Sequence, residues 1–226
     1  MKAGKLILLI ILSALLSSCR DSVSWEGLSE KYLADEDVGT LIFVRCTEGS
    51  NAVVEYYLKV TDKSVDSPDS TVKWVLFAQG EAFIGKNGLG KSSEGDGKTP
   101  VGEYAVSTAF GRYADPGTLL PWKQITPGTF ACDEEGRYYN TIIDTAAVHH
   151  PCKGEDMYHT SPEYDFGMAL DYNPSCTYPL GSAIFFHCKG SKSWTGGCVA
   201  VDKSLMVDIL RTAVPGVMVC IYPDNL

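Results

Sequence analysis

Positive charge is scarce in this sequence. Its 226 residues include 19 lysines and arginines against 28 aspartates and glutamates, which gives a net charge of −9. An acidic surface repels phosphate backbones and anionic headgroups. The composition therefore argues against a protein that binds nucleic acid or an anionic lipid surface through charge.

The N-terminal apolar run is too short to cross a bilayer. Leu6 to Leu16 follows two lysines and falls well short of the roughly 20 residues that a spanning helix needs. This pattern is typical of an export signal. The run ends at Leu16-Ser17-Ser18-Cys19, which resembles a bacterial lipobox. We expect residues 1–18 to be a lipoprotein signal peptide and Cys19 to carry a lipid that anchors the protein outside the cytoplasm, in the cell envelope. The alternative is an ordinary cleavable signal with an incidental cysteine.

The sequence contains no internal repeat and no low-complexity tract. Residues 19–38 are polar and acidic and read as a tether, with a short helix around Ser29 to Leu33. Residues 39–226 read as one mostly β domain, built as β-sheets or a β-sandwich with one short helix that begins after Asp202. The expected strands are Thr40–Cys46, Ala52–Val60, Thr71–Gln79 and Glu81–Gly85 (a pair joined near Gly80), Gly102–Gly111, Tyr138–Asp144, Phe166–Tyr172, Ser182–Cys188 and Val217–Pro223.

The stretch Gly85 to Ser92, "GKNGLGKS", matches the pattern of a phosphate-binding loop. Such a loop needs a helix after it, whose N-terminus binds the anion. The residues that follow, "SEGDGKTP", are rich in glycine and proline, which oppose a helix. ATP and GTP are also scarce outside the cytoplasm. We therefore expect a glycine-rich turn between strands and no nucleotide binding.

Cys198 and His187 are the strongest candidates for chemistry. Cys198 follows two glycines on a bend, where backbone amides could form an oxyanion hole. His187 lies at the end of an apolar strand, and a nucleophilic thiol needs an imidazole within reach. We expect the two segments to be neighbours in one sheet, and the helix that follows to favour the thiolate. Adjacent strand residues face opposite sides, so Cys188 should point away.

These residues also have simpler interpretations. Cys198 could be half of a structural disulfide, which is common in exported proteins, and His187 could be a core histidine with its hydrogen bonds satisfied. The eight cysteines become an odd number once Cys19 is set aside, which suggests one thiol kept free. For the rest, we expect Cys46 to pair with Cys220, Cys132 with Cys152, and Cys176 with Cys188.

The order of these motifs resembles the YkuD-type L,D-transpeptidases. The resemblance rests on "GDGKTPVGEY", on "YYN" and "FGMALDYN", and on His187 followed by Thr195-Gly196-Gly197-Cys198-Val199. It covers about residues 70 to 220. The chain departs from the family in having Gly196 where many members have histidine, and Ala200 where many have arginine or asparagine.

The resemblance implies acyl transfer on peptidoglycan stem peptides without a metal or cofactor. Cys198 would be the nucleophile and His187 the base, while Thr195, Gly196 and Gly197 would shape the oxyanion hole. The thioester would pass to an amine of a neighbouring stem, or to water in an L,D-carboxypeptidase, and carbapenems would acylate the cysteine. A non-catalytic wall-binding lipoprotein is the alternative outside the enzyme class. We expect a monomer. The expected substrate contacts are Lys98, Tyr172, Asn173 and Trp194.

Three histidines, His149, His150 and His159, gather with Cys152, Glu155 and Asp156. Their spacing matches no standard metal motif. We expect a surface loop over or beside the active cleft, and no metal.

Overall fold

The computed structural model describes residues 23–62, 71–148, 152 and 154–226. The expected signal peptide, the lipid-anchored Cys19, His149 and His150 lie outside the described residues. The strands, in chain order, are β1 (Thr40–Cys46), β2 (Asn51–Asp62), β3 (Thr71–Phe83), β4 (Gly102–Gly111), β5 (Trp122–Gln124), β6 (Thr129–Ala131), β7 (Ile142–Asp144), β8 (Glu155–Asp156), β9 (Gly167–Leu170), β10 (Phe185–Cys188), β11 (Val199–Val201) and β12 (Val217–Pro223). The helices are α1 (Trp25–Ala34), the 3₁₀ turn η1 (Glu163–Asp165) and α2 (Lys203–Thr212).

The main sheet closes on itself. Its nine strands run in the order β12-β1-β2-β3-β11-β10-β9-β4-β5, and β12 also pairs with β4. Val217 of β12 lies opposite Thr40 of β1, and Val219 lies opposite Tyr104 of β4. The mostly β prediction is confirmed, and this sheet is a closed ring in which β5 pairs with the end of β4 beyond the part that pairs with β12.

The prediction of a strand pair joined near Gly80 is wrong, because β3 runs without interruption from Thr71 to Phe83. Gly80 lies opposite Val54 within the ladder of β2 and β3. A β-carbon on Gly80 would come 3.0 Å from Cδ2 of Leu205 in α2. The glycine therefore allows a helix to pack closely on the strand and does not form a turn.

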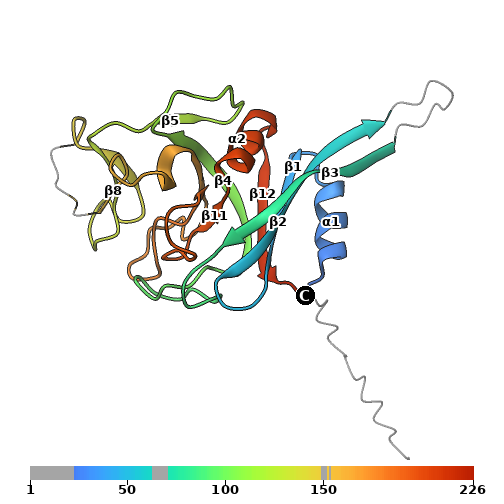
Figure 1. Ribbon diagram of the computed structural model, residues 1–226, viewed down its shortest axis with the longest axis horizontal. Coiled ribbons are helices and arrows are strands. Elements are labelled where there is room, and N and C mark those ends of the chain that lie inside the picture. The colour runs from blue at the N-terminus through green and yellow to red at the C-terminus, as the bar shows by residue number, and fades with distance from the viewer. Residues whose placement is uncertain (1–22, 63–70, 149–151, 153) are drawn as a thin grey trace, which may run out of the picture.

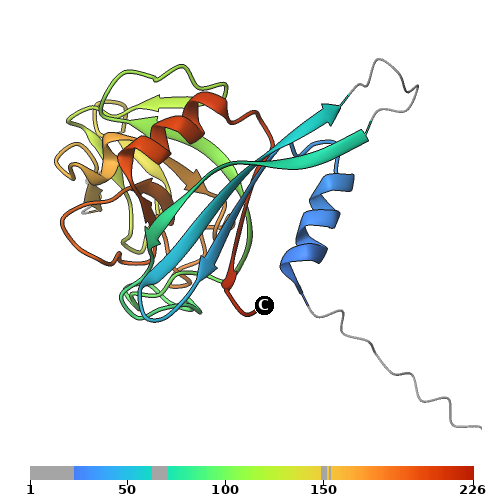
Figure 2. The same ribbon diagram turned by 45° about the vertical axis from the view of Figure 1, so that its right-hand side comes forward.

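The two α-helices cover opposite faces of the long β2–β3 hairpin (Figures 1 and 2). Side chains alternate between the two faces of β1, which explains this arrangement. Leu41 and Phe43 belong to the same hydrophobic cluster as the buried residues of α1, whereas Ile42 and Val44 belong to the cluster that contains the buried residues of α2. The part of the expected tether that the structure describes is thus packed against the sheet. Trp25 of α1 donates from Nε1 to the carbonyl of Asp224, 3.1 Å away, so this helix also contacts the strand end after β12.

The helix expected after Asp202 is confirmed as α2. Asp202 occupies the N-cap position but makes no capping hydrogen bond with its side chain. Its carboxylate pairs instead with Lys189 at 3.2 Å. Neither helix in the described part of the chain is long and apolar enough to cross a membrane.

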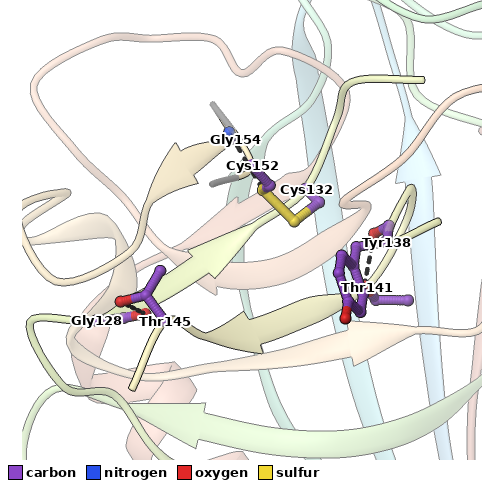
Figure 3. Close-up of a disulfide and its surroundings, with 7 residues drawn as sticks. All are labelled: Gly128, Cys132, Tyr138, Thr141, Thr145, Cys152 and Gly154. Atoms are coloured by element: carbon purple, nitrogen blue, oxygen red, sulfur yellow. Dashed lines mark hydrogen bonds between the residues drawn. A yellow bond between two sulfur atoms is a disulfide. The ribbon is translucent and has the colours of Figure 1, made fainter. Parts of the chain in front are cut away.

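A smaller sheet, in the order β7-β6-β8, lies beside the ring (Figure 1). A disulfide between Cys132 and Cys152 joins the end of β6 to the segment before β8 (Figure 3), which confirms one expected pair. The other two pairs are wrong. Register places Cys46 opposite Pro223 and Cys220 opposite Phe43, and the two thiols lie in different core clusters. Cys176 and Cys188 are also free thiols.

Candidate active site

His187 lies on β10 and Cys198 directly precedes the adjacent strand β11, so the two segments are neighbours in one sheet, as the sequence predicted. β10 and β11 run parallel, with His187 opposite Ala200. Cys198 precedes Ala200 by two positions, so its side chain leaves the same face of the sheet as that of His187. Both residues line a cleft of about 410 Å³. The neighbouring Cys188 faces the other way, into the main core, and its Sγ contacts the carbonyl of Phe166 at 3.4 Å.

The imidazole of His187 is held in one tautomer. Its Nδ1 lies 2.8 Å from the carbonyl oxygen of Cys188, and a carbonyl only accepts, so Nδ1 carries the proton and Nε2 is an acceptor. The ring of Tyr164 packs edge-on against it, with centroids 5.4 Å apart. Burial lowers the pKa of His187 below its ordinary value. The geometry therefore presents a neutral base.

The thiol of Cys198 is free and almost fully buried, with 8% of its surface exposed. The interpretation as a disulfide cysteine is therefore wrong for this structure. Sγ lies 3.2 Å from the Ala183 carbonyl, to which it donates, and accepts from the Phe185 amide at 3.3 Å. Burial raises the pKa of Cys198 to about 12, although the Phe185 amide acts in the other direction. The expectation of a thiolate favoured by the following helix is wrong, because β11 intervenes before α2.

Two threonines fix the turn that carries Cys198. Thr195 donates from Oγ1 to the Cys198 carbonyl at 2.7 Å and accepts from the Gly197 amide at 3.1 Å. Thr99, which is fully buried, donates to the Gly197 carbonyl at 2.8 Å. The Gly197 amide is thus used within the turn, and the amides of Gly196 and Cys198 remain as candidates for an oxyanion hole.

Gly197 is one of the positions where only glycine fits. Its φ is +152°, and a β-carbon there would lie 2.8 Å from the Lys98 carbonyl oxygen. A β-carbon on Gly196 would meet nothing within 4 Å. The first glycine of the pair is therefore permissive, and the second is required by its backbone conformation.

Acidic side chains line much of the cleft wall. They are Glu94, Asp133, Glu155 and Glu163. Glu155 accepts from the Tyr164 hydroxyl at 2.6 Å, and burial raises its pKa. Tyr164 therefore links this carboxylate to the ring of His187. Nothing in the sequence around "PEYDFG" distinguished Tyr164 from the other tyrosines.

Of the expected substrate contacts, only Trp194 lines this cleft. It is partly exposed, and the ammonium groups of Lys86 and Lys192 lie 5.6 and 4.6 Å from its ring centroid. The backbone of Lys98, rather than its side chain, lies against Gly197. The substrate-contact role of all four residues stays a prediction.

Tyr172 lines a second cavity of about 320 Å³, which shares Ala183 and Ile184 with the cleft. Asn173 closes the loop that follows, since its side chain donates to the carbonyls of Thr177 and Gly181 at 3.0 and 2.9 Å. Tyr172 thus faces the second cavity, and Asn173 lines neither the cleft nor that cavity.

Thr99 and Asn140 support the site and were missed as individual residues. Asn140 accepts from the Ala183 amide at 3.0 Å, and Ala183 is the residue whose carbonyl meets the Cys198 thiol. Both lie in segments on which the resemblance rested, "GDGKTPVGEY" and "YYN". A closer reading of those segments could have found them, although not their contacts.

The histidine loop offers little support for a metal. Cys152 is consumed by its disulfide, and His159 pairs with Asp156 at 2.8 Å with most of its side chain exposed. Among the described residues, no group of three or more potential ligands is gathered closely enough to hold an ion. Glu155, from the same loop, does line the cleft.

The fold and this cleft define a class of protein: a mostly β domain with a buried thiol and a neutral imidazole, the pair used in acyl transfer. A family model, that of the YkuD L,D-transpeptidase catalytic domain, matches residues 64–221. The chain therefore belongs to the YkuD family, whose members act on peptidoglycan stem peptides. A search of the curated proteins found no match.

Proposed function

We propose that this protein is a peptidoglycan L,D-transpeptidase with Cys198 as nucleophile and His187 as base. Family membership gives the reaction class. The observation that carries the assignment of residues is the cleft shared by a free Cys198 thiol and a His187 whose Nε2 is free to accept a proton.

The protonation states suggest the order of events. Burial disfavours both thiolate and imidazolium, so the resting pair is neutral. The proton then moves from Cys198 to Nε2 of His187 as sulfur attacks the carbonyl of the tetrapeptide stem. Backbone amides of the Thr195–Cys198 turn stabilise the oxyanion. His187 returns the proton to the departing D-alanine amine, which leaves a thioester on Cys198.

The second half-reaction decides between two activities. Attack by an amine of a neighbouring stem gives a crosslink, whereas attack by water gives a trimmed tripeptide. The acidic wall of Glu94, Asp133, Glu155 and Glu163 supports the amine, since a cationic acceptor gains from negative charge near the thioester. An L,D-carboxypeptidase is the alternative.

Incubation with purified disaccharide-tetrapeptide tests both. We expect crosslinked dimers together with released D-alanine. Tripeptides without dimers would support the carboxypeptidase, and no conversion would contradict the enzyme.

Intact-mass measurement with meropenem tests the nucleophile independently of the acceptor. We expect one covalent adduct on the wild type and on Cys176→Ser, in which a half-exposed thiol outside this cleft is removed. Cys198→Ser should give no adduct. An adduct that persists in Cys198→Ser would contradict the assignment.

A further inference from the structure

The phosphate-loop lookalike contains a buried lysine. Lys91 occupies the position that would reach a nucleotide phosphate, yet its side chain is only 2% exposed. In place of a phosphate, its Nζ lies 3.2 Å from Oδ1 of Asp96 and 3.4 Å from the carbonyl oxygen of Ser93. No helix follows this segment, so the match to the motif has another explanation.

Lys91 is wedged between two backbone segments that hold Cys198. A β-carbon on Gly197 would lie 3.6 Å from its Nζ, and a β-carbon on Gly181 would clash with its Cε. Gly197 precedes Cys198 directly. Gly181 begins the segment that ends in Ala183, whose carbonyl receives the Cys198 thiol. The lysine is therefore buried against both of the segments that contact Cys198.

Asp96 fixes the lysine in this place. Its carboxylate accepts from the amides of Ser92, Ser93 and Lys98 at 2.8, 3.1 and 3.0 Å. Burial acts to raise the pKa of Asp96, but these amides and Lys91 outweigh it and hold the pKa at about 2. The Asp96 carboxylate thus accepts the backbone hydrogen bonds that a bound phosphate would need. Lys91 and Asp96 therefore form a largely buried ion pair.

We propose that Lys91 is a positioning residue for the reaction of Cys198, which fixes the backbone on both sides of the thiol and places a positive charge near the sulfur. The charge stabilises the sulfur as its proton leaves for His187. The inference rests on the proposed function for its role in turnover, but the effect on the thiol is measurable without turnover.

The charges around Cys198 set the expected sign. Those that face the cleft are Glu94, Asp133, Glu155, Glu163, His187 and Lys192, with Lys91 buried against the turn. Burial is the largest effect on the pKa of Cys198 and raises it. The charge of Glu155 raises this pKa further, whereas the charge of Lys91 lowers it. Removal of the Lys91 charge should therefore make the thiol harder to ionise.

The test is the pH dependence of Cys198 alkylation by iodoacetamide, followed from pH 6 to 11 by peptide mapping, which separates Cys198 from Cys176. Lys91→Gln keeps a hydrogen bond to Asp96 and loses the charge, and Lys91→Met loses both. Because the pKa of Cys198 lies above this pH range, the alkylation rate follows the small thiolate fraction at each pH, and we expect both variants to react about tenfold more slowly than wild type throughout. Lys73→Met, which removes a charge from an exposed pair on the distant hairpin, should match wild type.

The direction separates a charge effect from damage to the fold. A loosened turn exposes Cys198 to water and moves its pKa down, toward the roughly 8.5 of a free cysteine. An alkylation rate of Lys91→Gln that is equal to or above that of wild type at the same pH therefore overturns the inference. Loss of product formation by Cys198→Ser, or its retention, bears on the proposed function alone, so the two failures are distinguishable.

Discussion

At the scale of single residues, two backbone carbonyl groups fix the hydrogen bonds of the His187 imidazole and the Cys198 thiol. The Cys188 carbonyl fixes the proton of His187 on Nδ1, and the Ala183 carbonyl accepts a hydrogen bond from the Cys198 thiol. Both acceptors are backbone atoms, so side-chain substitution elsewhere does not remove them directly. The reactive pair is thus preorganised in its neutral form.

The neutral state of His187 predicts that the rate of acylation falls at a lower pH than it would with an ordinary histidine as base. Burial lowers the pKa of the imidazole, so its basic form persists at pH values where a free histidine, with a pKa near 6.5, is half protonated. We expect meropenem acylation to reach its half-maximal rate at a pH below 6.5. A half-maximal rate at or above pH 6.5 would contradict this protonation state.

The two glycines before Cys198 predict unequal costs. Gly197→Ala forces a side chain into a left-handed conformation against the Lys98 carbonyl, and should lower the free energy of unfolding by about 2 kcal/mol. Gly196→Ala projects into open space and should change it by less than about 0.5 kcal/mol. Urea denaturation of the two variants measures both values. Equal destabilisation would show that the backbone conformation of Gly197 is not the constraint.

Sequence reasoning succeeded at this scale where chemistry restricts residue type. A thiol and an imidazole with two glycines indicated His187 and Cys198, and pleating predicted the orientation of Cys188. It failed for supporting residues such as Tyr164 and Asn140, whose roles depend on which segments meet. It also expected the helix after Asp202 to favour the thiolate, because the short β11 between Cys198 and that helix gave no clear pattern of its own.

At the scale of elements, α1 acts as a cover for one face of the sheet. Trp25, Leu28 and Tyr32 are buried against β1 and β12. Sequence analysis expected a tether there, because the segment is polar and acidic on average and its apolar residues are few. Trp25, Leu28 and Tyr32 nevertheless recur at helical spacing and form one inward face.

Leu28→Ala tests this cover. Truncation of a side chain with 4% exposure should lower the free energy of unfolding by about 2–3 kcal/mol. Glu30→Ala, on the exposed face of the same helix, should change it by less than about 0.5 kcal/mol. Chemical denaturation provides the comparison, and equal values would mean that α1 is not docked in solution.

The Cys132–Cys152 disulfide joins the end of β6 to the segment before β8 (Figure 3). β8 follows it with Glu155, whose partner Tyr164 packs on His187. Replacement of both cysteines by serine frees a loop with a sequence separation of 20 and should cost about 3 kcal/mol. We also expect slower acylation by meropenem. Cys176→Ser is the control, and unchanged stability and rate in the double variant would refute the link.

At the scale of the whole molecule, closure of the sheet joins distant parts of the chain. β12 contacts both β1 and β4, and sequence patterns predicted all three strands without predicting their partners. Periodicity reports which face of a strand is buried, whereas pairing depends on the global arrangement. The same gap explains the wrong pairing of Cys46 with Cys220.

We further propose that Cys19 anchors the molecule in the cell envelope. The sequence before it has the composition of an export signal and resembles a lipobox at its end, and it precedes a domain whose proposed substrate lies outside the cytoplasm. Membrane fractionation should find the wild type with the membranes and Cys19→Ser in the soluble fraction. Equal partitioning of the two proteins would reject a lipid on this residue.

The hydrogen bond between Trp25 and the Asp224 carbonyl brings the first and last described elements together (Figure 2). A short linker could therefore join residue 226 to residue 24 without rebuilding the ring. New ends could open in the turn between β1 and β2, where Glu48 and Gly49 are exposed. Such a circular permutant should keep its cleft, because every strand would retain its neighbours.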